Sequence, residues 1–257
     1  MTDSIAVAAE WDRNSEAWAA NLKAGNDLIN ECFGMPLFLD EIGDLHGLDV
    51  LDAGCGEGRS SRHLAAKGAN VIGVDISPGM IAHALSREAA EHQGIDFQLA
   101  SCADLNSFPE EHFDLVTSFM ALMDTPGLSI VLSEFYRVLR VGGRLAIAIR
   151  HPCHFTPGFS ILKNQQRQRA GLTVAGYFAE QPYKEHWRFP GQEAGDFEVT
   201  RFPYTLADYV NSMIEQGFTI TGLREPKPTE EMCLTLPSLR FWQLHGALYL
   251  FLIGAKR

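Results

Sequence analysis

The chain has 257 residues, 46% of them hydrophobic, and a formal net charge of −11. This length fits a single α/β domain that carries an insertion, and the acidic balance disfavours DNA or RNA as a partner. Because we find no run of about 18 apolar residues, no basic-then-apolar leader pattern and no C-x-x-C pair, we expect a cytoplasmic protein with reduced thiols and no membrane partner.

The first predicted element is a helix over residues 4–30. Its Trp11, Trp18 and Leu22 fall close to one face at helical spacing. Such a face fits two alternatives, docking of the helix onto the main body or a cover over a ligand pocket. We treat residues 4–44 as an N-terminal helical cover.

Strands and helices then alternate as far as residue 150. Apolar runs at 49–53, 70–74, 95–100, 113–118 and 143–150 predict buried parallel strands. Between them, Ser77 and Pro78 place a capping hydroxyl before a proline that opens a helix, and a second apolar stripe predicts a helix over 128–139. Right-handed crossovers turn this order into a doubly wound sheet.

The turn after the first strand carries the main chemical signal. It has a glycine at every second position from Gly54 to Gly58, with Asp52 ahead of it and Glu57 inside it. Glycine permits positive φ and close approach of a ligand to the backbone, and Asp75, 21 residues after Gly54, ends the second strand where a ribose diol would need an acceptor. Two acidic residues would repel a pyrophosphate. The turn therefore predicts a nucleotide-type cofactor that carries positive charge.

Residues 151–203 break the rhythm with prolines and many aromatic side chains. A structureless loop of this length is unusual, so we expect a small cap or lid with an apolar pocket for an acceptor. After it, Thr205 and Asp208 match a capping box, and apolar runs at 218–223 and 248–255 predict a closing β-hairpin. Residues 204–257 thus form a C-terminal helix and hairpin.

Several stretches resemble one known family. The segment 51–58 is similar to the first motif of class I S-adenosylmethionine-dependent methyltransferases, and 74–77 to the second. The segments 113–116 and 137–143 resemble later signatures of the same family, and 118–124 with His151, Pro152 and Cys153 resembles its bacterial small-molecule, type 11-like branch. The resemblance implies one class I domain over 1–257 with its cofactor-binding core at 45–150. It also implies a Rossmann-like, seven-stranded sheet with a terminal antiparallel strand.

The resemblance further implies S-adenosylmethionine as the cofactor and S-adenosylhomocysteine as the product. Asp75 resembles the family's ribose ligand. Cys102 stands where the family often has an aspartate near adenine, so we expect the backbone of Ala103 and the carboxylate of Asp104 to take that place. The full set of expected cofactor contacts is Trp11, Asp52, Gly54, Gly56, Asp75, Ile76, Met80, Ala103, Asp104, Phe119 and Met120.

For the reaction, the sequence offers three candidate catalytic residues, His151, Asp124 and Tyr177. His151 comes first because its ordinary pKa lies near neutrality and it follows the fifth strand. We expect no metal, since His151 and His154 lack further ligands at suitable spacing. The predicted activity is methyl transfer to an O or N atom of a small, aromatic or heterocyclic metabolite by a monomer or homodimer. An RNA or protein methyltransferase and a non-catalytic cofactor-binding module remain as alternatives.

Overall fold

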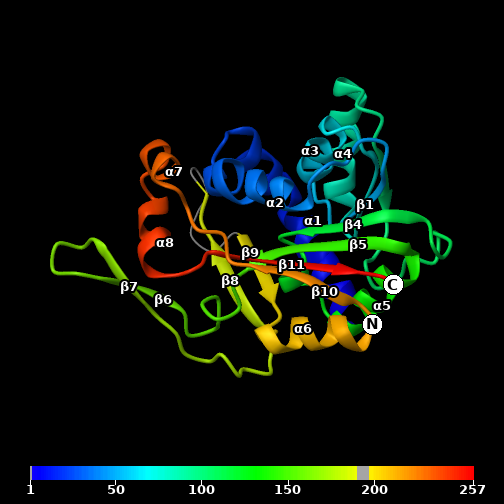
Figure 1. The fold of residues 1–257 in the computed structure, drawn as a ribbon. Helices are drawn as coiled ribbons and strands as arrows, with labels where there is room; N and C mark the ends of the chain where they lie inside the picture. Colours follow the sequence, from blue (N-terminus) through cyan, green and yellow to red (C-terminus); the bar gives the residue numbers. More distant parts are fainter. Residues whose placement is uncertain (1, 190–196) are drawn as a thin grey trace.

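The computed structural model describes residues 2–189 and 197–257 (Figure 1). Its centre is a seven-stranded sheet in the order β10-β11-β5-β4-β1-β2-β3. The strands are β1 (Asp49–Ala53), β2 (Asn70–Asp75), β3 (Asp96–Leu99), β4 (Phe113–Phe119), β5 (Leu139–Arg150), β10 (Thr219–Arg224) and β11 (Tyr249–Ala255). Strand β11 runs antiparallel to both neighbours, β5 and β10, while the other pairs are parallel. The predicted Rossmann-like sheet with an antiparallel last strand is confirmed.

Both faces of the sheet are buried, which explains the continuous apolar runs of the sequence. Successive residues of a strand point to opposite faces, and Val50 packs in one apolar core while Leu51 packs in the other. Leu115 and Val116 of β4 divide between the same two cores. Such strands need helices on both sides.

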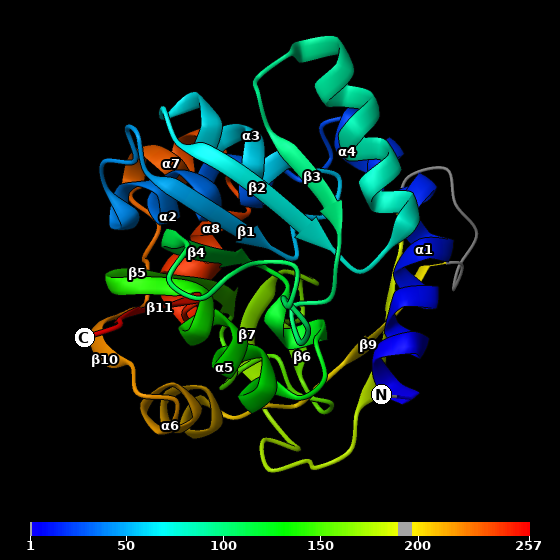
Figure 2. The ribbon, with the colours of Figure 1, turned by 90° about the vertical axis from the view of Figure 1, so that its right-hand side faces the viewer.

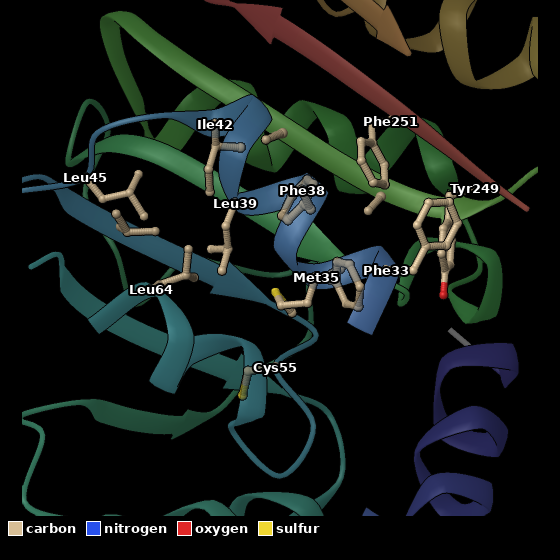
Figure 3. Close-up of a cluster of buried hydrophobic side chains, with 14 of the residues drawn as sticks. Phe33, Met35, Phe38, Leu39, Ile42, Leu45, Cys55, Leu64, Tyr249 and Phe251 are labelled. Atoms are coloured by element: carbon tan, nitrogen blue, oxygen red, sulfur yellow. The ribbon is translucent and has the colours of Figure 1, made fainter. Parts of the chain in front are cut away.

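Helices from different parts of the chain cover the two faces. One face carries η1 (Asn30–Gly34, a π-helix), α2 (Met35–Ile42), α3 (Arg59–Ala66), α4 (Pro78–Glu91) and α8 (Leu239–His245). Figure 3 shows how Phe38 and Ile42 of α2 lie against Phe251 and the strands there. The other face carries α5 (Leu128–Val138) and α6 (Leu206–Glu215). In α4, Ser77 accepts a hydrogen bond from the backbone N–H of Met80, so the predicted cap is present.

The N-terminal helix α1 (Thr2–Lys23) is shorter than predicted. Gly25 takes a left-handed φ of 71° just beyond its end, which is a common way to end a helix. Helix α1 lies along α4 and β9 rather than on the sheet (Figure 2). In the part of the chain that the structure describes, no helix is long and apolar enough to cross a membrane.

The expected cap consists of two small antiparallel sheets. They are β6 (Ser160–Lys163) with β7 (Arg169–Thr173), and β8 (Tyr183–Trp187) with β9 (Phe197–Arg201). The β6–β7 pair projects away from the body (Figure 1), and the β8–β9 pair reaches back to α1. Residues 190–196 of the predicted cap lie outside the described residues.

The C-terminal region differs from the prediction in one respect. Thr205 and Asp208 form the predicted capping box of α6. Strands β10 and β11 pair in antiparallel fashion, but α7 (Glu230–Thr235) and α8 lie between them in the chain. The predicted closing pair of strands is therefore present, with two short helices in its connection that were not predicted.

Candidate active site

A cavity of about 150 Å³ lies where β1, β2 and β4 end. The carboxyl ends of parallel strands are the usual ligand crevice of such sheets. Its wall comes from the glycine turn, the ends of β2 and β4, helix α1 and strand β8. Of the predicted cofactor residues, those on the wall are Trp11, Gly54, Gly56, Asp75, Ile76, Met80, Phe119 and Met120.

At the glycine turn, the cavity is bordered by backbone without side chains, at Gly54 and Gly56. Gly54 has a φ of 79°, and a Cβ placed there would lie 2.4 Å from the Cβ of Ala121. Gly56 also has a left-handed φ, 57°. A side chain at either position is strained, and at position 54 it would also collide with the wall.

Asp75 closes β2 at the edge of the cavity. Its two carboxylate oxygens accept hydrogen bonds from the backbone N–H groups of Gly56 and Ser77, both at 2.9 Å. Burial raises the pKa of Asp75 above its usual value, and these hydrogen bonds oppose the shift. A carboxylate has about four acceptor positions, so two remain for the hydroxyls of a ribose.

Asp52 does not border the cavity. It is buried behind the turn and accepts hydrogen bonds from the hydroxyls of Ser60, Ser61 and Thr117, at 2.5, 2.7 and 3.1 Å. These bonds tie the first turn of α3 to β1 and β4. Asp52 therefore holds the shape of the glycine turn from behind.

At the predicted adenine side, the wall is formed by Ser101 and Cys102. Ala103 and Asp104 are not on it. Asp104 is exposed and accepts a 2.8 Å hydrogen bond from the side chain of Asn106. We expected Ala103 and Asp104 here because Cys102 departs from the family pattern, whereas in the structure Ser101 and Cys102 border the cavity.

Three tryptophans form the roof of the cavity. Trp11 and Trp18 come from α1 and Trp187 from β8, with ring centroids 5.5–6.3 Å apart. Phe197 of β9 stacks on Trp187 at 5.1 Å with 4° between the ring planes. The aromatic side chains of the two segments thus form one apolar cover.

Polar contacts fasten this roof. The buried carboxylate of Glu10 pairs with Lys184 and accepts a 2.9 Å hydrogen bond from the backbone N–H of Thr200. On the other side of α1, Asp12 accepts a 2.7 Å hydrogen bond from the backbone N–H of Gly79, in the first turn of α4. Helix α1 therefore bridges the cap and the core directly above the cavity.

The floor follows the end of β4. Met120 has a φ of 61°, a conformation that is strained for a residue with a side chain and often occurs at functional sites. Shortly after it, Met123 and Asp124 border the cavity. Met120 was a predicted cofactor contact, but nothing in the sequence indicates its left-handed backbone.

Asp124 is buried and forms an ion pair with Arg201 of β9. Burial raises the pKa of Asp124 to about 6. Arg201 also contacts Glu185 at 2.6 Å, and Glu185 contacts Arg150 at 2.8 Å. These two arginines hold the pKa of Glu185 at about 2 against its burial. The four side chains form one charge cluster, in which Asp124 and Arg201 are buried and Arg150 and Glu185 are half-buried.

The other two candidate catalytic residues lie away from the cavity. His151 uses both ring nitrogens: Nε2 contacts Glu225 at 2.8 Å, and Nδ1 accepts from the backbone N–H of Cys153 at 3.2 Å. Burial lowers its pKa. The hydroxyl of Tyr177 accepts a 3.1 Å hydrogen bond from the backbone N–H of Leu206. Neither borders the cavity, so their catalytic roles stay predictions that this geometry disfavours.

Among the described residues, no group of three or more His, Cys, Asp or Glu side chains is placed to hold a metal ion. The wall does fit S-adenosylmethionine. Asp75 has acceptor positions for the ribose, and the backbone at Gly54 leaves no room for a side chain beside the ligand. The aromatic roof matches an adenine and a sulfonium, because aromatic faces attract both.

Known proteins agree with this geometry. The chain matches the methyltransferase domain family over residues 51–147. A malonyl-[acyl-carrier protein] O-methyltransferase of Enterobacter lignolyticus is 39% identical over 210 residues, which are 77% of this chain and 73% of that protein. The corresponding protein of Yersinia pestis is 34% identical over 55% of this chain, and the match spans only 49% of its length.

Among solved structures, an S-adenosylmethionine-dependent methyltransferase from Mesorhizobium loti superposes with a TM-score of 0.70 and 26% identity. The match covers 86% of this chain and 96% of that one. The sheet order, the glycine turn, Asp75 and these matches agree. The chain belongs to the class I S-adenosylmethionine-dependent methyltransferases.

Proposed function

We propose that this enzyme methylates an O or N atom of a small, aromatic or heterocyclic metabolite. The observation that carries the proposal is the composition of the cavity wall. Three tryptophans and four methionines border the cavity, and Asp124 lies on the same wall. A mostly apolar cavity with a few polar groups is typical of a small-molecule site.

The bound cofactor supplies an activated methyl group, so the protein has to position the acceptor and remove its proton. One oxygen of Asp124 pairs with Arg201, and no described residue donates to the other. With a pKa of about 6, Asp124 is mostly ionised at neutral pH and can accept a proton from an acceptor hydroxyl. A base of this kind adds about 10²–10⁴-fold to a rate.

The roof contributes in a second way. Trp11, Trp18 and Trp187 shield the cavity from water, which otherwise solvates the nucleophile. We expect the cap over 151–203 and α1 to open for exchange of ligands and to close for reaction. The two relatives above are named as O-methyltransferases, which favours oxygen as the attacking atom here.

The test uses purified enzyme with methyl-labelled S-adenosylmethionine. We would offer a panel of small phenols and N-heterocycles in parallel with total RNA and with bulk protein. Label in the small-molecule fraction, lost in Asp124→Asn while S-adenosylhomocysteine still binds, is the expected result. Label only in RNA or protein would overturn the small-molecule proposal. Cofactor binding without transfer to any of the three would favour the non-catalytic module.

A further inference from the structure

A second, much smaller cavity lies beside the first. Its volume is about 20 Å³, and Met123 borders both cavities. The other lining residues include Arg150, Arg201, Tyr183 and Tyr209. A space of this size holds about one water molecule, or one oxygen atom of a ligand. It is a polar recess behind the floor of the large cavity.

Arg201, which lines this recess, has a side-chain donor without a hydrogen-bond partner in the described part of the chain. Its Nη1 pairs with Asp124, and its Nε donates to Glu185 at 2.6 Å. The side chain is only 4% exposed, yet its Nη2 is buried with no hydrogen-bond partner in the described part of the chain. Buried donors nearly always have partners. An acceptor atom in the recess would provide one.

The charges around the recess indicate what kind of acceptor fits. Asp124 and Glu185 balance Arg150 and Arg201 when all four are ionised. The cluster then has no surplus positive charge for a carboxylate or phosphate, and burying a further unpaired charge is costly. A neutral carbonyl oxygen needs only the donor that Nη2 supplies.

We propose that the recess is a carbonyl subsite for the methyl acceptor, in which Nη2 of Arg201 donates to the carbonyl oxygen. This inference rests on the proposed function. The acceptor hydroxyl lies beside Asp124, loses its proton to that carboxylate, and forms the new O–C bond as the S–C bond of the cofactor breaks. Because Asp124 and Arg201 touch, the hydroxyl and carbonyl must be neighbours in the acceptor. An ortho-hydroxyaryl ketone has this arrangement.

The test compares matched probes by calorimetry on enzyme saturated with S-adenosylhomocysteine. 2-Hydroxyacetophenone carries the carbonyl, 2-ethylphenol has nearly the same shape without it, and salicylate replaces it by a carboxylate. We expect the ketone to bind at least tenfold more tightly than 2-ethylphenol and salicylate. Equal affinities, tightest binding of salicylate, or no measurable binding of the ketone would each overturn the subsite.

A variant assigns the preference to Arg201. In Arg201→Lys, which keeps the charge but lacks the forked guanidinium, the ketone should lose its advantage, leaving less than a twofold difference, while affinity for S-adenosylhomocysteine stays within about twofold. A preference that persists in the variant would overturn the assignment. If the variant does not fold, a crystal structure of the wild-type ketone complex decides, through the distance from the carbonyl oxygen to Nη2.

Binding and turnover separate this inference from the function on which it rests. Preferential binding of the ketone with no methylation of any small probe would refute the proposed function and leave the subsite standing. Equal binding and equal methylation of the ketone and 2-ethylphenol would refute the subsite and leave the proposed function standing.

Discussion

Replacement of Asp75 by alanine should weaken cofactor binding and also destabilise the fold, because the carboxylate bonds to the backbone of Gly56 and Ser77. Two acceptor positions of this carboxylate are used by Gly56 and Ser77, and two are left for ribose hydroxyls. A hydrogen bond to a charged group contributes at least about 1.5 kcal/mol, so the loss of two gives about 3 kcal/mol, or roughly 150-fold in Kd. Calorimetry with S-adenosylhomocysteine measures this change directly.

Asp104→Ala is the matched control. This aspartate was also a predicted cofactor ligand, but it is exposed and does not border the cavity. We expect its substitution to change Kd less than threefold. The reasoning is refuted if Asp75→Ala binds within about fivefold of wild type while keeping its fold, or if the two variants lose affinity equally.

Four further predictions follow from the site. Gly54→Ala should lose about 1–2 kcal/mol of folding stability from its left-handed φ alone, and more from the clash with Ala121. The variant should have a lower Tm and bind the cofactor more weakly; an unchanged Tm would contradict this. Because burial raises the pKa of Asp124 to about 6 and a base must be unprotonated, wild-type kcat/KM should fall about tenfold per pH unit below that value. Any residual activity of Asp124→Asn should not show this fall at low pH. His151→Ala should retain near-normal kcat with a lower Tm, since both ring nitrogens serve structural contacts; loss of kcat in the folded variant would restore its role as base. Protease cleavage within 155–200 should slow when cofactor and acceptor are both bound, and equal cleavage rates would argue against a lid.

Local patterns were sufficient for the core of the fold. Strands β1 to β5 are apolar runs separated by caps and glycines, and each signal lies within a few residues of the element that it predicts. The short helices α7 and α8 were missed because they hold few turns and little periodicity. Strands β6, β7 and β8 of the cap were missed because their residues are exposed or half-buried, so no buried apolar run marks them, and the neighbouring prolines favour a loop.

In the site, too, residues of one local motif were predicted, while contacts between distant segments of the chain were missed. The glycine turn and Asp75 form one local motif, and the sequence placed both at the cavity. Arg201 was missed because its partner Asp124 lies 77 residues earlier, and no pattern in the sequence joins them. The contact of His151 Nε2 with Glu225 was missed for the same reason, since the two residues lie 74 positions apart.

The bond from Glu10 to Thr200 joins residues 190 positions apart. Contacts of such long range close late, because the intervening chain must first be ordered. During synthesis, the strands and the glycine turn up to residue 150 leave the ribosome well before β9. For some time, a nascent chain therefore has the glycine turn but not the complete roof of the cavity. The enzyme becomes able to enclose a ligand only when most of its length has been made, and β11, which completes the sheet beside β5, is made later still.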